Sequence, residues 1–351
     1  MSWRERLRER AGEIGQKRLT VGFDGFADTI VRPLRQAPAP NIPPQPFETI
    51  REFGEYLAAK AEKSCSVELR SQGRQLGGNL PFLSRAAGQM GLDVSCIGML
   101  GDPGAPDPLF ASMPCKLYPF APPGQSTCME FNDGKVLLSA DCELPGDPWE
   151  IVLQATDGQA PGLFQDADLI ALLNWSELSF AHRLWEKVLE VVRAASPDKT
   201  RFAFFDLCDV SRRSAGELDA VLRLIGAFST LRTGILSLNE NEALAAARQL
   251  LSPDITDPAA IASALRDTYA VDEVIVHTIR DTALVTPRGT VRLPTDFVAH
   301  PRISTGAGDH FNAASCFAAV MDFPDLERVE FANTFAHFYV SEGRTPQLSE
   351  L

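Results

Sequence analysis

The run Thr305-Gly306-Ala307-Gly308-Asp309 stands directly before an apolar segment, 311–320, whose spacing predicts a helix that begins near Gly308. Backbone N–H groups at a helix N-terminus lack partners within the helix, and the helix dipole adds positive potential there. Gly306, Ala307 and Gly308 are therefore expected to form a site for an anion such as a phosphate. Glycine lets the anion approach the backbone closely.

Asp309 ends this run, and a carboxylate there would repel a bound phosphate. It is useful at that position when it accepts the proton of an attacking hydroxyl group, so Asp309 is a candidate general base. The simpler alternative is an Asp near a helix N-cap after a glycine turn, which requires no ligand. Both interpretations stay open on these five residues.

Outward from this run, strand-like and helix-like segments alternate over the second half of the chain. The strands are expected at 169–173, 202–207, 234–238 and 273–277, and the helices at 179–195, 215–228, 240–251, 259–269 and 308–320. Such alternation predicts right-handed crossovers and an α/β fold, with a mainly parallel central sheet flanked by helices on both faces.

The first half is less regular. Residues 19–28 are expected to form one strand, 32–46 a proline-rich loop or edge excursion, and 47–63 a helix. An Asp-Gly pair between the runs 127–131 and 135–138 predicts a hairpin. We expect a single domain over residues 1–351, with segments of about 29–46 and 105–142 inserted as a small β lid.

The chain resembles the ribokinase-like (PfkB) carbohydrate kinases in four landmarks that follow one another in the family's order. They are Asp28, Gly77-Gly78-Asn79, Asn239-Glu240-Asn241-Glu242 and the run 304–314. The resemblance implies a ribokinase-like fold, with Asp309 as the catalytic base. It also implies ATP-dependent phosphorylation of a hydroxyl group on a sugar or sugar-like molecule.

The same resemblance implies a role for further residues. Asp28, Gly78 and Asn79 would bind the substrate, with Asp24 as a weaker candidate. Glu242 would orient Mg²⁺. The nucleotide would be bound by Asn239, Thr278 and Arg280.

Each landmark also has a structural interpretation. The two glycines could form an ordinary turn, and Asp24 and Asp28 could be turn residues. Asn239 could be an N-cap and Glu242 a carboxylate that stabilises the helix dipole. Arg280 could reach phosphate oxygens or could be a surface arginine.

Three positions depart from the family pattern. Ile303-Ser304 replaces the usual Asp-Thr, which weakens the case for potassium activation, and Phe82 replaces an amide in the first signature. Ile279 and Thr282 stand where two glycines usually follow a strand. These departures leave two alternatives open: a nucleoside kinase of the same superfamily, or a catalytically silent regulator that binds a sugar or a nucleotide.

The composition limits the classes of molecule that the protein is expected to bind. A formal net charge of −13 disfavours nucleic acid as a partner, and no apolar run is long enough to suggest a membrane span. The seven cysteines show no paired spacing, which favours a reducing cytoplasm over a disulfide framework. The hairpin at 127–138 could pair by its edge with a second subunit, so a homodimer through the lid is a further expectation.

Overall fold

A computed structural model describes residues 2–36, 43–140 and 142–351. The helices are α1 (Trp3–Glu9), α2 (Ile50–Ala58), α3 (Asn79–Gln89), α4 (Pro148–Ala155), α5 (Ala160–Asp166), α6 (Ala181–Arg193), α7 (Ala215–Ser229), α8 (Glu240–Leu250), α9 (Pro258–Tyr269), α10 (Ala307–Val320) and α11 (Asp325–Glu342). Short 3₁₀ segments lie at Ala11–Gln16, Val210–Arg212 and Leu348–Glu350.

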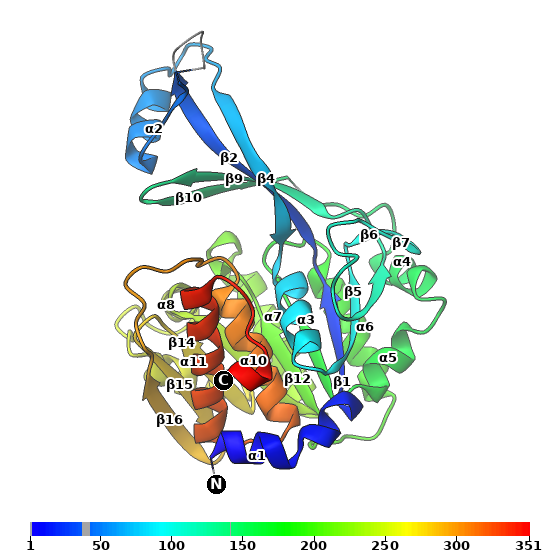
Figure 1. The fold of residues 1–351 in the computed structure, drawn as a ribbon. Coiled ribbons are helices and arrows are strands. Elements are labelled where there is room, and N and C mark those ends of the chain that lie inside the picture. The colour runs from blue at the N-terminus through cyan, green and yellow to red at the C-terminus, as the bar shows by residue number, and fades with distance from the viewer. Residues whose placement is uncertain (1, 37–42, 141) are drawn as a thin grey trace.

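The strands are β1 (Arg18–Phe23), β2 (Phe26–Gln36), β3 (Gln45–Pro46), β4 (Glu68–Gly77), β5 (Asp93–Gly98), β6 (Gly101–Asp102), β7 (Ala105–Pro106), β8 (Lys116–Pro119), β9 (Gly124–Phe131), β10 (Gly134–Ser139), β11 (Leu169–Leu172), β12 (Phe202–Asp206), β13 (Thr233–Asn239), β14 (Glu273–His277), β15 (Asp281–Thr286) and β16 (Gly289–Pro294). Most of them belong to two sheets, which Figure 1 shows as a large body and a smaller projection above it.

The central sheet has nine strands in the order β16-β15-β14-β13-β12-β11-β1-β5-β8. Neighbours run parallel from β8 to β14, while β15 and β16 are antiparallel. Because side chains alternate between the two faces of a strand, both faces of these apolar strands must be covered. In β11, Leu169 and Ala171 join one core cluster and Ile170 and Leu172 join the other.

Helices cover both faces of this sheet. Residues of α4 to α9 contribute to one core cluster, and residues of α1, α3, α10 and α11 contribute to the other. Helix α10 is buried along nearly its whole length and packs against α3 and α11. The α/β fold class that was predicted, with a mainly parallel sheet between two helical layers, is confirmed.

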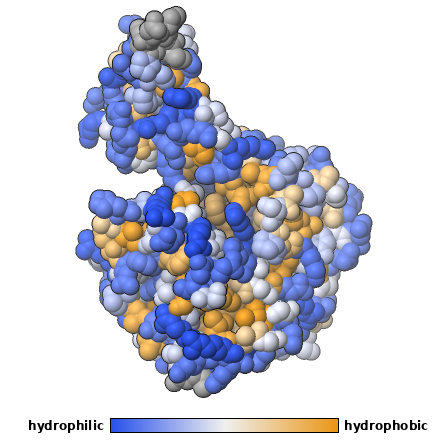
Figure 2. Space-filling view, in the orientation of Figure 1, coloured by the Kyte–Doolittle hydropathy of each residue, from blue (hydrophilic) through white to orange (hydrophobic). Residues whose placement is uncertain are grey.

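The second sheet has five strands, ordered β10-β9-β2-β3 with β4 also paired to β2. Helix α2 packs on it through a small core of its own, formed by Val31, Phe47, Phe53, Met129 and Phe131. We call this unit, residues 26–36, 43–77 and 124–139, the lid. Figure 2 shows it standing above the body across an open notch.

Two details of the N-terminal half differ from the sequence-based predictions. Residues 19–28 form two strands that belong to different sheets, because β1 ends at Phe23 and β2 begins at Phe26. Residues 32–36, which were expected to be part of a loop, instead continue β2 to Gln36. Pro33 is tolerated there because it pairs with β4, and the ladder does not require an N–H from Pro33 on the other side of β2. The rest of that stretch includes residues 37–42, which lie outside the described residues.

The inserted segments fall in several places. Residues 29–36 and 124–139 lie in the lid sheet, and the expected hairpin is present as β9 and β10, paired antiparallel. Residues 116–119 form β8 at the edge of the central sheet, and 105–106 pair with β6. In the part of the chain that the structure covers, no helix has the length and apolar character needed to span a bilayer.

Candidate active site

The glycine run forms the entry to α10, as the sequence predicts. Gly306 is the N-cap and has φ of 81°, a left-handed conformation that favours glycine. A Cβ atom at this position would also lie 2.9 Å from the ring of Phe82. Among the described residues no side chain caps this helix, but the N–H of Ala307 donates to the carbonyl oxygen of Ser304 at 3.2 Å. The N–H of Gly308 has no backbone partner among the described residues and is left for an anion.

The run is held in place by two aromatic residues. The Nδ1–H of His310 donates to the carbonyl oxygen of Gly306 at 2.6 Å, so its Nε2 accepts from the Thr345 hydroxyl at 2.9 Å. The His310 ring stacks on Tyr339 at 3.5 Å, and the Tyr339 hydroxyl donates to the carbonyl oxygen of Thr305 at 2.8 Å. Burial lowers the pKa of His310 to about 4, which keeps the ring neutral.

Asp309 lies in the first turn of α10 and is partly exposed. Burial, followed by the negative charges of Asp206 and Asp24, raises its pKa well above the usual range. A hydrogen bond with the Asn79 side chain acts in the opposite direction. A carboxyl group with raised proton affinity at the rim of an anion site is suited to accept a proton during reaction.

Asp24 is fully buried at the break between β1 and β2. Its carboxylate accepts from the backbone N–H groups of Asn79 and Leu80 and from Asn174 Nδ2, each at 2.8 Å. Burial raises the pKa of Asp24 to about 6. This side chain caps α3, and Gly78 with φ of 84° gives it room, because a Cβ there would collide with the carboxylate.

Asp28 points from β2 of the lid toward the same region. Its carboxylate accepts a short hydrogen bond from the Ser126 hydroxyl on β9. Burial raises its pKa, while the Ser126 bond and the charge of Lys135 lower it. A Cβ atom on Gly77 would collide with this carboxylate, so the glycine keeps the space around Asp28 open.

Asn239 and Glu242 form a capping box at the start of α8. Asn239 Oδ1 accepts from the Glu242 N–H at 3.0 Å, and Glu242 Oε2 accepts from the Asn239 N–H at 3.0 Å. Burial, and then the charges of Asp206 and Asp309, raise the pKa of Glu242 well above its usual range. Asn239 and Glu242 therefore do cap the helix. A bound cation would also reduce the repulsion between Glu242 and the neighbouring carboxylates.

Sequence reasoning missed Asp206. Its carboxylate accepts from Asn312 Nδ2 at 2.6 Å and from the Cys208 N–H at 2.9 Å, and its pKa is raised to about 6 by burial. Asn312 also accepts from the Ser237 hydroxyl at 2.7 Å. The available signal was its position at the carboxyl end of a parallel strand, where sites of α/β proteins gather.

Asp206, Glu242 and Asp309 would offer oxygen ligands to Mg²⁺. The charges of Asp206 and Asp309 raise the pKa of Glu242, and the charge of Asp206 raises the pKa of Asp309. Over residues 2–36, 43–140 and 142–351 no cluster of three or more His, Cys, Asp or Glu is placed to enclose a metal directly. Mg²⁺ commonly keeps several waters and takes few protein ligands, so these residues fit a hydrated ion.

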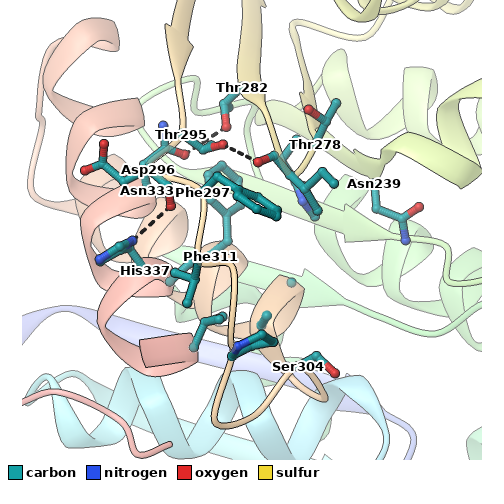
Figure 3. Close-up of a pocket in the computed structure, with 18 of the residues that line it drawn as sticks. Asn239, Thr278, Thr282, Thr295, Asp296, Phe297, Ser304, Phe311, Asn333 and His337 are labelled. Atoms are coloured by element: carbon teal, nitrogen blue, oxygen red, sulfur yellow. Dashed lines mark hydrogen bonds between the residues drawn. The ribbon is translucent and has the colours of Figure 1, made fainter. Parts of the chain in front are cut away.

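A cavity of about 590 Å³ lies beside the glycine run. Figure 3 shows Asn239 at one end and Asn333 and His337 on α11 at the other, with Phe297 and Phe311 between them. Its size and its mixture of aromatic and amide groups suit a nucleotide.

The predicted nucleotide residues are distributed unevenly around this cavity. Thr278 lines it together with Asn239, whereas Arg280 is exposed and is not among the lining residues. The hydroxyl of Thr278 instead accepts from the N–H of Arg280 at 3.0 Å. His277, which sequence reasoning left aside, also lines the cavity and stacks on Phe311 at 4.7 Å.

Comparisons with known proteins show the family and the fold to which the chain is similar. The model of the prokaryotic ketohexokinase family matches residues 3–351. A ketohexokinase from Haloferax volcanii is 27% identical over 356 residues, covering 100% of this chain and 93% of that protein.

Solved structures show the same fold at low sequence identity. An adenosine kinase from Sinorhizobium meliloti has a TM-score of 0.65 at 16% identity, covering 95% of this chain and 97% of that one. An Arabidopsis thaliana ribokinase complexed with ribose and ATP has a TM-score of 0.59 at 16% identity, with 95% of each chain covered. The ribokinase-like fold expected from the sequence motifs is confirmed.

Proposed function

Because the chain belongs to the prokaryotic ketohexokinase family, we propose that it transfers the γ-phosphoryl group of ATP to a hydroxyl group of a ketohexose. That it is a carbohydrate kinase follows from the family. The ketohexose as acceptor is our inference from the name of the family and of the Haloferax volcanii relative.

One observation carries the proposal: Asp309 lies between an anion site and the substrate motif. It lies in the first turn of α10 beside the glycine run, and the side chain of Asn79 at the start of α3 lowers its pKa. An acceptor hydroxyl placed near Asn79 and Asp28 would therefore face both the base and the transferred phosphoryl group.

The roles of the residues follow from this placement. Asp309 accepts the proton of the acceptor hydroxyl, and the N–H groups of Gly306, Ala307 and Gly308 stabilise the charge on the phosphoryl oxygens. Asp28 and Asn79 orient the acceptor, while Asp24 positions Asn79 by capping α3. Bound Mg²⁺ would neutralise phosphate charge.

Glu242 and Asp206 are proposed to hold the hydrated Mg²⁺, because both carboxyl groups are buried and the charge of Asp206 raises the pKa of Glu242. Asn239 and Thr278 are proposed to contact the nucleotide, because both line the adjoining cavity. Arg280 would have to turn inward to contribute.

The test is Asp309→Asn. We expect kcat to fall by about 10³-fold or more while the Kd for ATP changes little, because the amide keeps the shape but cannot accept the proton. A variant that retains activity within about tenfold would rule out this base. Substrate class is settled in parallel by measuring ADP release over a panel of ketoses, aldoses and nucleosides.

That panel also separates the alternatives. Turnover that follows nucleosides would indicate a nucleoside kinase, and nucleotide binding without turnover would indicate a regulator. Replacing ATP with ADP in the same assay tests the phosphoryl donor.

We further propose a homodimer through the lid. Among the described residues, strand β10 is paired on one side only, and Leu137 and Leu138 on it are 51% and 57% exposed. Leu69 on β4 is 45% exposed as well. A monomer in sedimentation velocity at micromolar concentration would remove this proposal. The cytoplasm is the compartment proposed, on the scattered cysteines of the sequence.

A further inference from the structure

Lys135 on β10 reaches from the lid to the glycine run. It is the second residue of β10 and stands opposite Glu130 on β9. Its ammonium group donates a hydrogen bond to the hydroxyl of Thr305, the residue directly before Gly306. A cation on the lid is thus placed at the entrance of α10, where the anion site lies.

The ammonium group also acts on the acceptor side of the cleft. The charge of Lys135 lowers the pKa of Asp28 on β2 and the pKa of Cys128 on β9. Asp28 and Thr305 therefore both lie close to the same cation, one on the lid and one on the body. The space between them is where an acceptor hydroxyl and a phosphoryl group would meet.

The surrounding charge is negative. Burial raises the pKa of Asp24, Asp206, Glu242 and Asp309, and neighbouring carboxylates raise it further for Asp24, Glu242 and Asp309. A phosphoryl group in transfer adds negative charge on its oxygens. The helix N-terminus stabilises it from the body, and a cation on the lid could do so from the opposite side.

We propose that Lys135 is a catalytic residue. During transfer its ammonium group releases the Thr305 hydroxyl and donates its hydrogen bond to an oxygen of the γ-phosphoryl group instead. This rests on the proposed kinase function. The acceptor oxygen forms a bond to phosphorus, the bond from phosphorus to the leaving oxygen of ADP breaks, and its electron pair stays on ADP. The acceptor proton goes to Asp309, and Lys135 remains protonated throughout.

The placement gives Lys135 a second property. It belongs to the lid, so its charge reaches the phosphoryl group only when the lid lies over the body. Full stabilisation of the transition state therefore depends on lid position, which disfavours transfer to water in an open cleft.

A purely mechanical alternative is that Lys135 and Thr305 latch the lid shut. The two ideas differ in what the partner residue does. A latch depends equally on both side chains, whereas a phosphoryl contact depends on the cation and only weakly on the Thr305 hydroxyl.

The experiment compares Lys135→Met, Lys135→Arg and Thr305→Val, with Lys63→Met as a matched control, because Lys63 is an exposed lid lysine beyond the end of α2. We expect Lys135→Met to lower kcat by about 100-fold, as for loss of one oxyanion donor. Lys135→Arg should recover to within about tenfold, and Thr305→Val should lose no more than about fivefold. Equal losses in Lys135→Met and Thr305→Val, or an unchanged kcat in Lys135→Met, would overturn the proposal.

A binding measurement supplies a readout that needs no acceptor. ADP with orthovanadate mimics the phosphoryl group in transfer, and its Kd is measured by calorimetry beside that of ADP alone. Lys135→Met should weaken the vanadate complex by about 30-fold and leave ADP binding within about twofold. If the Kd of the ADP–vanadate complex does not change in Lys135→Met, the role of Lys135 is contradicted. If the wild type does not turn over the tested sugars but still needs Lys135 to bind vanadate, only the assignment of the acceptor is contradicted.

Discussion

The side chain of Asn79 lowers the pKa of the Asp309 carboxyl group, which links the N-terminus of α3 to the N-terminus of α10. These two residues are far apart in the sequence and belong to separate motifs. Asp24 fixes the backbone of Asn79 by accepting a hydrogen bond from its N–H group. The proposed base and the proposed substrate motif are therefore coupled electrostatically through Asn79.

Asn79→Ala should raise the pKa of Asp309, because the lost hydrogen bond favours the charged carboxylate. The base then stays protonated to a higher pH, and the acidic limb of kcat/KM against pH moves upward. The alkaline limb should not move. A pH profile whose acidic limb coincides with that of the wild type would show that Asn79 does not tune the base.

Gly306→Ala should disturb both folding and catalysis, because the positive φ is unfavourable for alanine and its Cβ would meet the Phe82 ring. We expect a loss of about 1–3 kcal/mol in unfolding free energy, measured in urea. Adding Phe82→Leu should recover part of it. Gly216→Ala on α7, where a Cβ meets open space, is the control and should lose nothing measurable.

Gly77→Ala should weaken the acceptor site, because the new Cβ displaces the Asp28 carboxylate from its place beside Ser126. The KM for the sugar is expected to rise by about tenfold, while the KM for ATP stays within about twofold. Gly54→Ala in α2 of the same lid, where a Cβ meets no atom, serves for comparison. A parallel rise in both KM values would point to general lid damage instead.

His277 should make stability depend on pH. Burial lowers its pKa from 6.5 to about 4, so the unfolded chain binds a proton between these values and the folded chain does not. Stability is therefore lost as the pH falls through that window. Relative to His277→Phe, the wild type should lose about 1–2 kcal/mol between pH 7 and pH 4.5, as measured by urea unfolding. Between pH 7 and pH 8 the difference should be flat, and a flat difference at low pH would contradict the burial of a neutral ring.

The second half of the fold was readable from the sequence, because each strand from β11 to β14 is a short apolar run bounded by helices of distinct period. The first half was harder. Residues 19–28 are β-rich throughout, so nothing local indicates that Asp24 and Gly25 separate two sheets. Helix α11 was missed because its apolar residues do not gather on one side.

Among the candidate site residues, motifs in the sequence pointed to Asp309, Asn79, Glu242 and Gly78, since each stands in a recognisable run. Residues that act through distant partners carried no such signal. Lys135 contacts Thr305, and Tyr339 holds the carbonyl of the same residue, across separations that only the folded chain brings together. The Phe82 ring likewise lies where a Cβ on Gly306 would stand, which gives a packing reason for the aromatic ring in the first signature.

The break between β1 and β2 has a further consequence for the order of events. Asp24 directly follows β1 of the body, and Asp28 lies in β2 of the lid, only four positions further along the chain. Any rotation of the lid about this junction carries Asp28 and leaves Asp24 in place. The proposed sugar-binding carboxylate of Asp28 would thus move together with the lid. Binding of the acceptor and closure of the cleft would then occur in one step.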